Sequence, residues 1–188
     1  MKPNGKQINY SIEFLSSAAK EFRKLKNVRA GSAENTKFGN SNFDLVVLLD
    51  VLEHTDDKKT LIEINRILKK EGLLVISVPA YGWMWSKWDV NLHHRRRYTK
   101  PSLAKVLKGA HFQILEISYF NSFLVLPVYI IRKIKTVLAP SEYGSDFRIG
   151  SPFVNNILMK LSDLERRLVI KSGIPFGLSI IVVAKKVD

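Results

Sequence analysis

Residues 43–79 of this chain read FDLVVLLDVLEHTDDKKTLIEINRILKKEGLLVISVP, and this stretch decides the fold. Its first part, Phe43 to Asp50, is a continuous apolar run bounded by turn residues, which is typical of a strand buried on both faces of a sheet. Asp56 to Lys70 has the apolar spacing of a helix, and Leu73 to Val78 is a second buried strand. This order predicts an α/β fold with a parallel sheet, which binds ligands at the carboxyl ends of its strands.

The rest of the chain continues the alternation of helices and strands. Upstream, we expect a helix over Ser11 to Leu25 and a short strand over Val28 to Gly31. Downstream, we expect in order a helix, a strand, two helices and a last strand, over Thr99 to Leu107, Phe112 to Tyr119, Asn121 to Leu138, Phe153 to Lys171 and Gly177 to Lys185. Residues 121–175 would then form a helical insertion that caps a single domain spanning residues 1–188.

Composition narrows the class of protein. The 188 residues are 46% hydrophobic and 25% charged, which fits one globular domain. The chain has no cysteine, which excludes disulfides and thiolate metal sites and favours a cytoplasmic protein. The longest apolar stretch, Phe123 to Ile131, has about half the length of a membrane-spanning helix. A formal charge of +13 favours either a polyanionic partner or a solvated basic surface.

The 43–79 stretch resembles the central motifs of class I S-adenosylmethionine-dependent methyltransferases of the type 11 and type 12 groups. The matching pieces are a strand that ends in Asp50, the turn from Asp50 to His54, the following helix, and Lys70-Glu71-Gly72 before the next strand. Residues 95–99 and 175–179 are similar to bacterial members that occur alongside glycan and lipid-linked sugar enzymes. The resemblance implies a Rossmann-like fold and methyl transfer from S-adenosylmethionine to a small acceptor or one linked to a lipid or glycan.

One departure from the family pattern concerns the sheet. The family places a first strand and a glycine-rich loop before its second strand, because glycine lets the backbone approach the cofactor. Only eight residues precede Asn9, where the resemblance places the end of the second strand. We therefore expect a truncated Rossmann-like sheet that lacks the first strand and the glycine loop, whose buried backbone groups stay unpaired unless a partner segment supplies the missing strand. A fragment, a mis-called start or a split gene would each explain the departure.

The resemblance assigns four residues to S-adenosylmethionine: Asn9, Ser32, Ala33 and Asp50. The family usually has an acidic residue at the position of Asn9, where a carboxylate accepts bonds from both ribose hydroxyls, and an asparagine offers only one oxygen. Ser32 also replaces an acidic residue. We therefore expect this chain to bind the cofactor weakly.

His54 is the candidate catalytic residue, because it follows a central strand and imidazole titrates near neutrality. It would act as a general base or contact the substrate. The structural alternative is a histidine that caps the next helix or bonds a backbone carbonyl. We expect no metal, although Asp50, Glu53 and His54 could hold a divalent ion through oxygen and nitrogen ligands, as in related quinone-biosynthesis methyltransferases.

A cationic run, Arg95-Arg96-Arg97-Tyr98, is the candidate substrate-binding segment. Guanidinium groups bind phosphate with two parallel hydrogen bonds, so these residues would hold an anionic acceptor. The alternative is a loop in which one arginine is structural and the others are solvated. Stacking on single-stranded nucleic acid is not favoured, because no RNA-binding motif accompanies the run.

Two classes of function remain open at this point. The chain is either a methyltransferase, or a C-terminal fragment of one, or an inactive remnant that acts as a binding subunit or attaches to an anionic membrane. The helix expected over Asn121 to Leu138 bears on this choice, because its broad apolar surface and basic end fit either an interfacial helix or a lid over the pocket.

Overall fold

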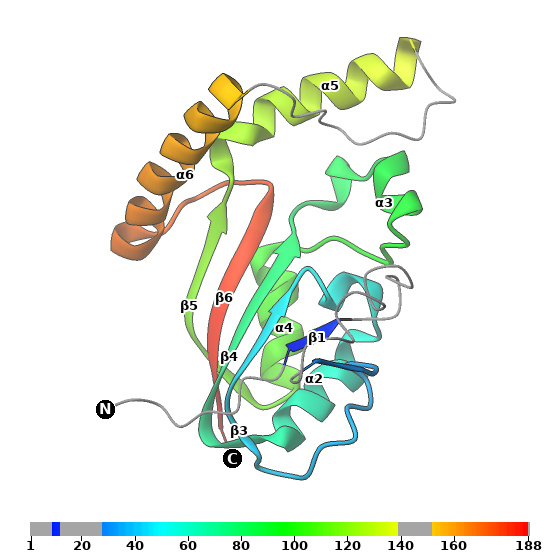
Figure 1. Ribbon diagram of the computed structural model, residues 1–188, viewed down its shortest axis with the longest axis vertical. Coiled ribbons are helices and arrows are strands. Elements are labelled where there is room, and N and C mark those ends of the chain that lie inside the picture. The colour runs from blue at the N-terminus through cyan, green and yellow to red at the C-terminus, as the bar shows by residue number, and fades with distance from the viewer. Residues whose placement is uncertain (1–8, 12–27, 139–151, 188) are drawn as a thin grey trace.

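The computed structural model describes residues 9–11, 28–138 and 152–187 (Figure 1). Its main sheet has four strands in the order β3-β4-β6-β5. The strands are β3 (Phe43–Leu49), β4 (Leu68–Pro79), β5 (Phe112–Phe120) and β6 (Ser179–Lys186). β3 and β4 are parallel, whereas β6 runs antiparallel to both of its neighbours. This arrangement confirms the expected Rossmann-like α/β class.

Helices α2 (Asp57–Ile67) and α4 (Lys100–Gly109) contribute to the core that covers one face of the sheet. Leu61 and Ile64 of α2 and Leu103 of α4 are buried in one cluster with Leu74 and Ile76 of β4. The Asp56 side chain caps α2 by accepting a hydrogen bond from the Lys59 amide, and Thr99 and Ser102 form a capping box at α4. The sequence motifs therefore set where both helices begin.

The end of α2 differs from the sequence-based expectation. The helix stops at Ile67 rather than Lys70, and β4 starts at Leu68, five residues before the expected strand. Leu68 adopts an extended conformation and pairs with Phe43 of β3. Gly72 is buried in this turn, and a Cβ there would come within 2.8 Å of the Lys69 carbonyl oxygen. Strand pairing therefore overrides the helical spacing of residues 68–70.

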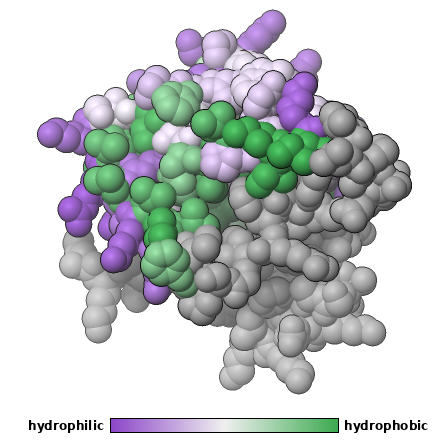
Figure 2. Space-filling model, turned by 90° about the horizontal axis from the view of Figure 1, so that it is seen from above, coloured by the Kyte–Doolittle hydropathy of each residue, from purple (hydrophilic) through white to green (hydrophobic). Residues whose placement is uncertain are grey.

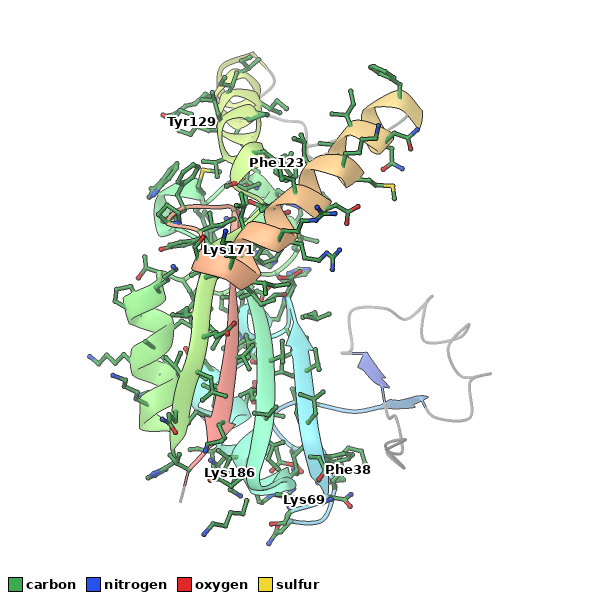
Figure 3. The ribbon with its side chains drawn as sticks, turned by 90° about the vertical axis from the view of Figure 1, so that its left-hand side faces the viewer. Phe38, Lys69, Phe123, Tyr129, Lys171 and Lys186 are labelled. Atoms are coloured by element: carbon green, nitrogen blue, oxygen red, sulfur yellow. The ribbon has the colours of Figure 1, made fainter. Side chains whose placement is uncertain are left out.

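The opposite face of β3 is exposed. Leu45, Val47 and Leu49 alternate along this face and are each about half accessible to solvent, at 51%, 47% and 61%. Among the described strands, β3 is also an edge of the four-stranded sheet. β1 (Asn9–Ser11) and β2 (Val28–Ala30) pair in parallel as a separate two-stranded sheet (Figure 3). The helix expected over Ser11 to Leu25 lies outside the described residues, apart from Ser11 at the end of β1.

Two long helices lie beyond one end of the sheet, past the carboxyl ends of β3 and β4 (Figure 1). The segment over residues 122–138 is a short turn, η3 (Ser122–Leu124), followed by α5 (Val125–Leu138), so Pro127 falls in the first turn of the helix, where proline is tolerated. α6 (Pro152–Ser172) joins β5 through Glu165, whose carboxylate accepts hydrogen bonds from the amides of Asn121 and Ser122. This is the expected helical insertion before the last strand.

The end of the molecule that carries these helices is rich in exposed apolar side chains (Figure 2). None of the helices that the structure describes is long and apolar enough to cross a bilayer.

Candidate functional site

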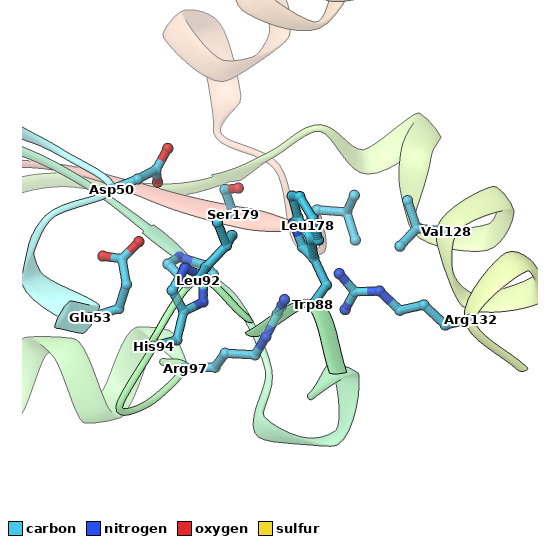
Figure 4. A pocket seen from close by; sticks show the side chains of 11 residues that line it. Asp50, Glu53, Trp88, Leu92, His94, Arg97, Val128, Arg132, Leu178 and Ser179 are labelled. Carbon is cyan, nitrogen blue, oxygen red and sulfur yellow. The ribbon is translucent and has the colours of Figure 1, made fainter. Parts of the chain in front are cut away.

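A pocket of about 280 Å³ opens beyond the carboxyl ends of β3 and β4 (Figure 4). This is the position at which the parallel topology predicts a ligand site. Its walls come from the turn after β3, from the segment between β4 and α4, from α5 and from the start of β6. The lining residues are Asp50, Glu53, Pro79, Trp88, Leu92, His94, Arg97, Val128, Arg132, Leu178 and Ser179.

Asp50 stands where β3 ends. Its backbone has a positive φ of 52°, and its amide donates to the Ser77 carbonyl of β4 at 3.0 Å. The Ser77 hydroxyl in turn donates to the Asp50 carboxylate at 3.1 Å. The neighbouring strand therefore fixes both the backbone and the side chain of Asp50 at the rim of the pocket.

Glu53 lies deeper, in the turn η1 (Leu52–His54), and its side chain is completely buried. Within the described part of the chain, neither carboxylate oxygen has a hydrogen-bond partner. Burial raises the pKa of Glu53 to about 8, and the negative charges of Asp50 and Asp89 add to the rise. A buried carboxyl group in this state is neutral at pH 7 unless a cation approaches it.

His54 and His94 meet edge to face beside Glu53. Their ring centroids are 4.7 Å apart, with an angle of 77° between the planes. Burial, and then the proximity of His94, lower the pKa of His54. His54 is therefore a neutral imidazole at pH 7 and can accept a proton or a metal ion. The ligand atoms of Glu53, His54 and His94 all lie within 4.8 Å of one another.

Asp89 organises the second wall of the pocket from the short helix α3 (Lys87–Asn91). Its carboxylate caps α3 through the Ser86 amide and also binds His94 Nδ1 at 2.9 Å and Arg97 Nε at 2.7 Å. Burial alone would raise the pKa of Asp89, but the hydrogen bonds from His94 and Arg97 outweigh it and hold the pKa well below its usual range. Asp89 therefore remains ionised.

The predicted substrate-binding run is largely occupied by contacts within the protein. Arg96 binds the Asp57 carboxylate at 2.6 Å, and the buried Tyr98 hydroxyl donates to the same oxygen at 3.3 Å. Arg97 binds Asp89 and also donates to the Ala80 carbonyl. Arg95 has an exposed side chain, and of the four residues only Arg97 lines the pocket.

The four residues assigned to the cofactor lie in three segments. Asn9 begins β1, and Asp50 follows β3. Ser32 and Ala33 belong to a tight turn in which the exposed Ser32 accepts from the Glu34 amide. The Glu34 carboxylate accepts from the Asp56 amide at 2.8 Å, and so ties this turn to the start of α2.

The fit to S-adenosylmethionine is partial. The turn at Ser32 and the Asp50 carboxylate offer polar groups beside the carboxyl ends of the strands. No glycine-rich turn after a strand is found among the described residues to cradle the amino-acid end of the cofactor.

Sequence reasoning missed Asp89, Trp88 and Arg132. The signal for Asp89 was present, because Ser86 and Asp89 have the spacing of a capping box. Arg132 belongs to the segment from Asn121 to Leu138, for which the sequence left open an interfacial helix or a lid over the pocket. Its side chain donates to the Met84 carbonyl and comes within 4.0 Å of the Asp89 carboxylate.

Comparisons with known proteins agree with this architecture. A family model described as a methyltransferase domain matches residues 5–76. A search of curated protein sequences finds no match. Over residues 5–76 the chain is therefore similar to methyltransferase domains.

Solved structures share the fold at low sequence identity. A SAM-dependent methyltransferase from Archaeoglobus fulgidus is 15% identical with a TM-score of 0.58, over 94% of this chain and 75% of that one. One from Thermotoga maritima is 17% identical with a TM-score of 0.54, over 96% and 73%. The [4+2]-cyclase SpnF is 20% identical with a TM-score of 0.54, over 97% and 67%. Because the last of these is called a cyclase, the fold alone does not fix the reaction.

Proposed function

We propose that this chain takes part in methyl transfer from S-adenosylmethionine to a small acceptor or one linked to a lipid or glycan. The observation that carries the proposal is the pocket beyond β3 and β4, with Asp50 at its rim and buried polar groups at its base. When bound, the cofactor supplies a methyl group that is already electrophilic. The protein then has to align the acceptor and to remove its proton where the acceptor atom carries one.

The cofactor would contact Asn9, Ser32, Ala33 and Asp50. The acceptor would enter from the side of Trp88, Leu92 and Arg132, which line the opposite wall of the pocket. Arg97, which lines the pocket, and the exposed Arg95 are the members of the cationic run that we assign to an anionic acceptor. Arg96 and Tyr98 both bind Asp57 and do not line the pocket.

His54 is the residue that we assign to proton removal in the metal-free chain. Its lowered pKa leaves the imidazole neutral at pH 7, which is the form that accepts a proton. Its position in the turn after β3 places it beside the Glu53 and His94 side chains.

Mapping of amide chemical shifts by NMR tests the proposal, since this method detects weak ligands. Millimolar S-adenosylhomocysteine should shift the amides of Ser32, Ala33 and Asp50, and Asp50→Ala should reduce these shifts. Asp163→Ala is the matched control, because Asp163 lies exposed on α6. Shifts confined to other parts of the chain, or none at all, would contradict a cofactor site at this edge of the sheet.

A second candidate function is attachment to an anionic membrane surface. Leu126, Ile130 and Ile134 expose about half or more of their surface on α5, and Phe153 of α6 is 72% exposed. Exposed basic side chains accompany them on the two helices, namely Lys133, Lys160, Arg166, Arg167 and Lys171. Apolar insertion and attraction to anionic headgroups would act together on such a surface.

A further inference from the structure

The cluster of Glu53, His54 and His94 contains the donor atoms of a metal site. Each residue offers one ligand atom, and the three atoms lie within 4.8 Å of one another. Two separate segments meet here, the turn after β3 and the loop after α3. The Arg95 amide donates to the Glu53 carbonyl at 2.8 Å and so holds the two segments together next to the cluster.

Glu53 is the member of the cluster that most needs a cation. Its side chain is fully buried, and its two oxygens have no hydrogen-bond partner within the described residues. Burying a carboxylate without a partner is costly. The charged groups that act on Glu53 are Asp50 and Asp89, which are negative, and Arg97, which already binds Asp89. A bound cation would give the Glu53 carboxylate the partner that it lacks among the described residues.

His94 is oriented as metal-binding histidines usually are. Its Nδ1 is 2.9 Å from the buried Asp89 carboxylate, which leaves Nε2 as the ligand atom. A carboxylate behind the ring fixes the tautomer and the orientation of a ligating histidine. Asp89 in turn is held by Arg97 and by the Ser86 cap of α3, so the support is itself rigid.

We propose that Glu53, His54 and His94 bind a divalent transition-metal ion, of which Zn²⁺ is the representative. Two imidazole nitrogens and one carboxylate oxygen suit Zn²⁺ or Fe²⁺, whereas Mg²⁺ and Ca²⁺ prefer oxygen ligands. This set differs from the Asp50, Glu53 and His54 alternative, because the Asp50 carboxylate is not part of the cluster.

A site with three protein ligands keeps at least one position open for water or for an acceptor oxygen. The ion would lie next to the pocket that Glu53 and His94 line. With the ion bound, His54 would use its lone pair as a metal ligand and could not act as the base. The ion would then lower the pKa of an acceptor hydroxyl bound to it. The inference goes beyond methyl transfer and does not depend on it, because the ligands need no cofactor.

The test is metal content and affinity of the full 188-residue chain, prepared without a polyhistidine tag. After dialysis against Zn²⁺ and desalting, mass spectrometry of the metals should find about one ion per chain, and Mg²⁺ should not be retained. Glu53→Gln and His94→Gln should each lose the ion. His111→Asn and Glu116→Gln are matched controls on exposed residues and should keep it.

A melting experiment followed by circular dichroism separates loss of ligands from loss of fold. Zn²⁺ should raise the melting temperature of the natural chain and leave that of Glu53→Gln unchanged. Without metal, Glu53→Gln should be at least as stable as the natural chain, because it removes an unpartnered buried carboxyl group. If the natural chain retains no more Zn²⁺ than Glu53→Gln, the site does not exist, whatever the cofactor titrations show.

Discussion

The Nε of Arg97 lies 2.7 Å from Oδ1 of Asp89, and neither side chain is more than 5% exposed. Arg97 also donates from Nη1 to the carbonyl of Ala80, the residue that follows β4. One arginine therefore joins the end of a central strand to helix α3. This contact gives Arg97 a structural part in addition to its place in the pocket wall.

Removing Arg97 should destabilise the protein strongly. Arg97→Ala leaves the buried Asp89 carboxylate without its main cationic partner, and we expect a loss of about 3–5 kcal/mol in the free energy of unfolding. Arg95→Ala, on an exposed neighbour, should change it by less than about 0.5 kcal/mol. Urea unfolding followed by circular dichroism measures both. If Arg97→Ala had the same free energy of unfolding as the natural chain, Arg97 would be a solvated residue that is available to substrate.

Glu63 should give the protein a defined dependence on pH. Its carboxylate binds Arg66 through two hydrogen bonds of 2.8 Å and accepts from the amide and hydroxyl of Thr36. The hydrogen bond from Arg66 is the main cause that lowers the pKa of Glu63 to about 2. The folded state therefore releases this proton more readily than the unfolded state does. The contribution of Glu63 to the free energy of unfolding is therefore fully present above about pH 4.5 and is lost as the pH falls toward 2.

We therefore expect Glu63→Gln to cost about 2 kcal/mol at pH 7 and progressively less below pH 4.5. Urea unfolding of both proteins between pH 3 and 7 measures the difference. Glu116→Gln on the exposed side of β5 serves as the control and should follow the natural chain at every pH. A difference that does not change with pH would mean that Glu63 acts through packing alone.

Cofactor binding should be weak and should respond to Asn9. The sequence contains no Gly-x-Gly-x-Gly motif, so we expect a dissociation constant for S-adenosylmethionine in the millimolar range, or no binding by calorimetric titration. Asn9→Asp should tighten binding roughly tenfold, because a carboxylate can accept from both ribose hydroxyls. Asn155→Asp makes the same charge change on α6 and should have no effect. Micromolar binding by the natural chain would refute this expectation.

Helices α5 and α6 should bind anionic vesicles at low salt. Co-sedimentation of the protein with vesicles of phosphatidylglycerol should fall as salt is added, since attraction to the headgroups is screened. The double change Lys133→Glu and Lys160→Glu should abolish it, whereas Lys105→Glu on α4 should not. Arg132 is left unchanged because it faces the Asp89 carboxylate. Protein that stays in the supernatant at low salt would favour a lid over the pocket instead.

The sequence predicted the layers of the fold better than it predicted the boundaries of its elements. Continuous apolar runs such as Phe43 to Asp50 identified the strands. The expected burial of this strand on both faces is wrong, because Leu45, Val47 and Leu49 are exposed on one face. The end of α2 was placed too late, because the spacing of residues 68–70 is also helical and only pairing with Phe43 decides for a strand. A local sequence pattern does not show which distant residues a segment will pair with.

The pocket opens at the edge of the sheet where the sequence placed the candidate residues, and contacts within the protein engage part of the cationic run. Asp50, Glu53 and His54 could be named as candidates because they directly follow a strand, β3, whose apolar run is plain in the sequence. The engagement of Arg96 and Tyr98 by Asp57 was not foreseen, because Asp57 lies about 40 residues earlier in the sequence. His94 directly precedes the cationic run, and its contact with Glu53 and His54 depends on the same kind of distant packing.

The exposed face of β3 has a practical consequence for every measurement of stability proposed above. Leu45, Val47 and Leu49 offer apolar surface to solvent in the folded state, and environment-sensitive dyes such as ANS bind surface of this kind. Such a dye would then fluoresce brightly on binding to the folded chain, before any heating. A dye-based melt would start from a high signal and hide the transition, and bright dye binding would not be a sign of a molten state. Circular dichroism and tryptophan emission do not share this background, and Trp83, Trp85 and Trp88 all lie close to the pocket end of the molecule.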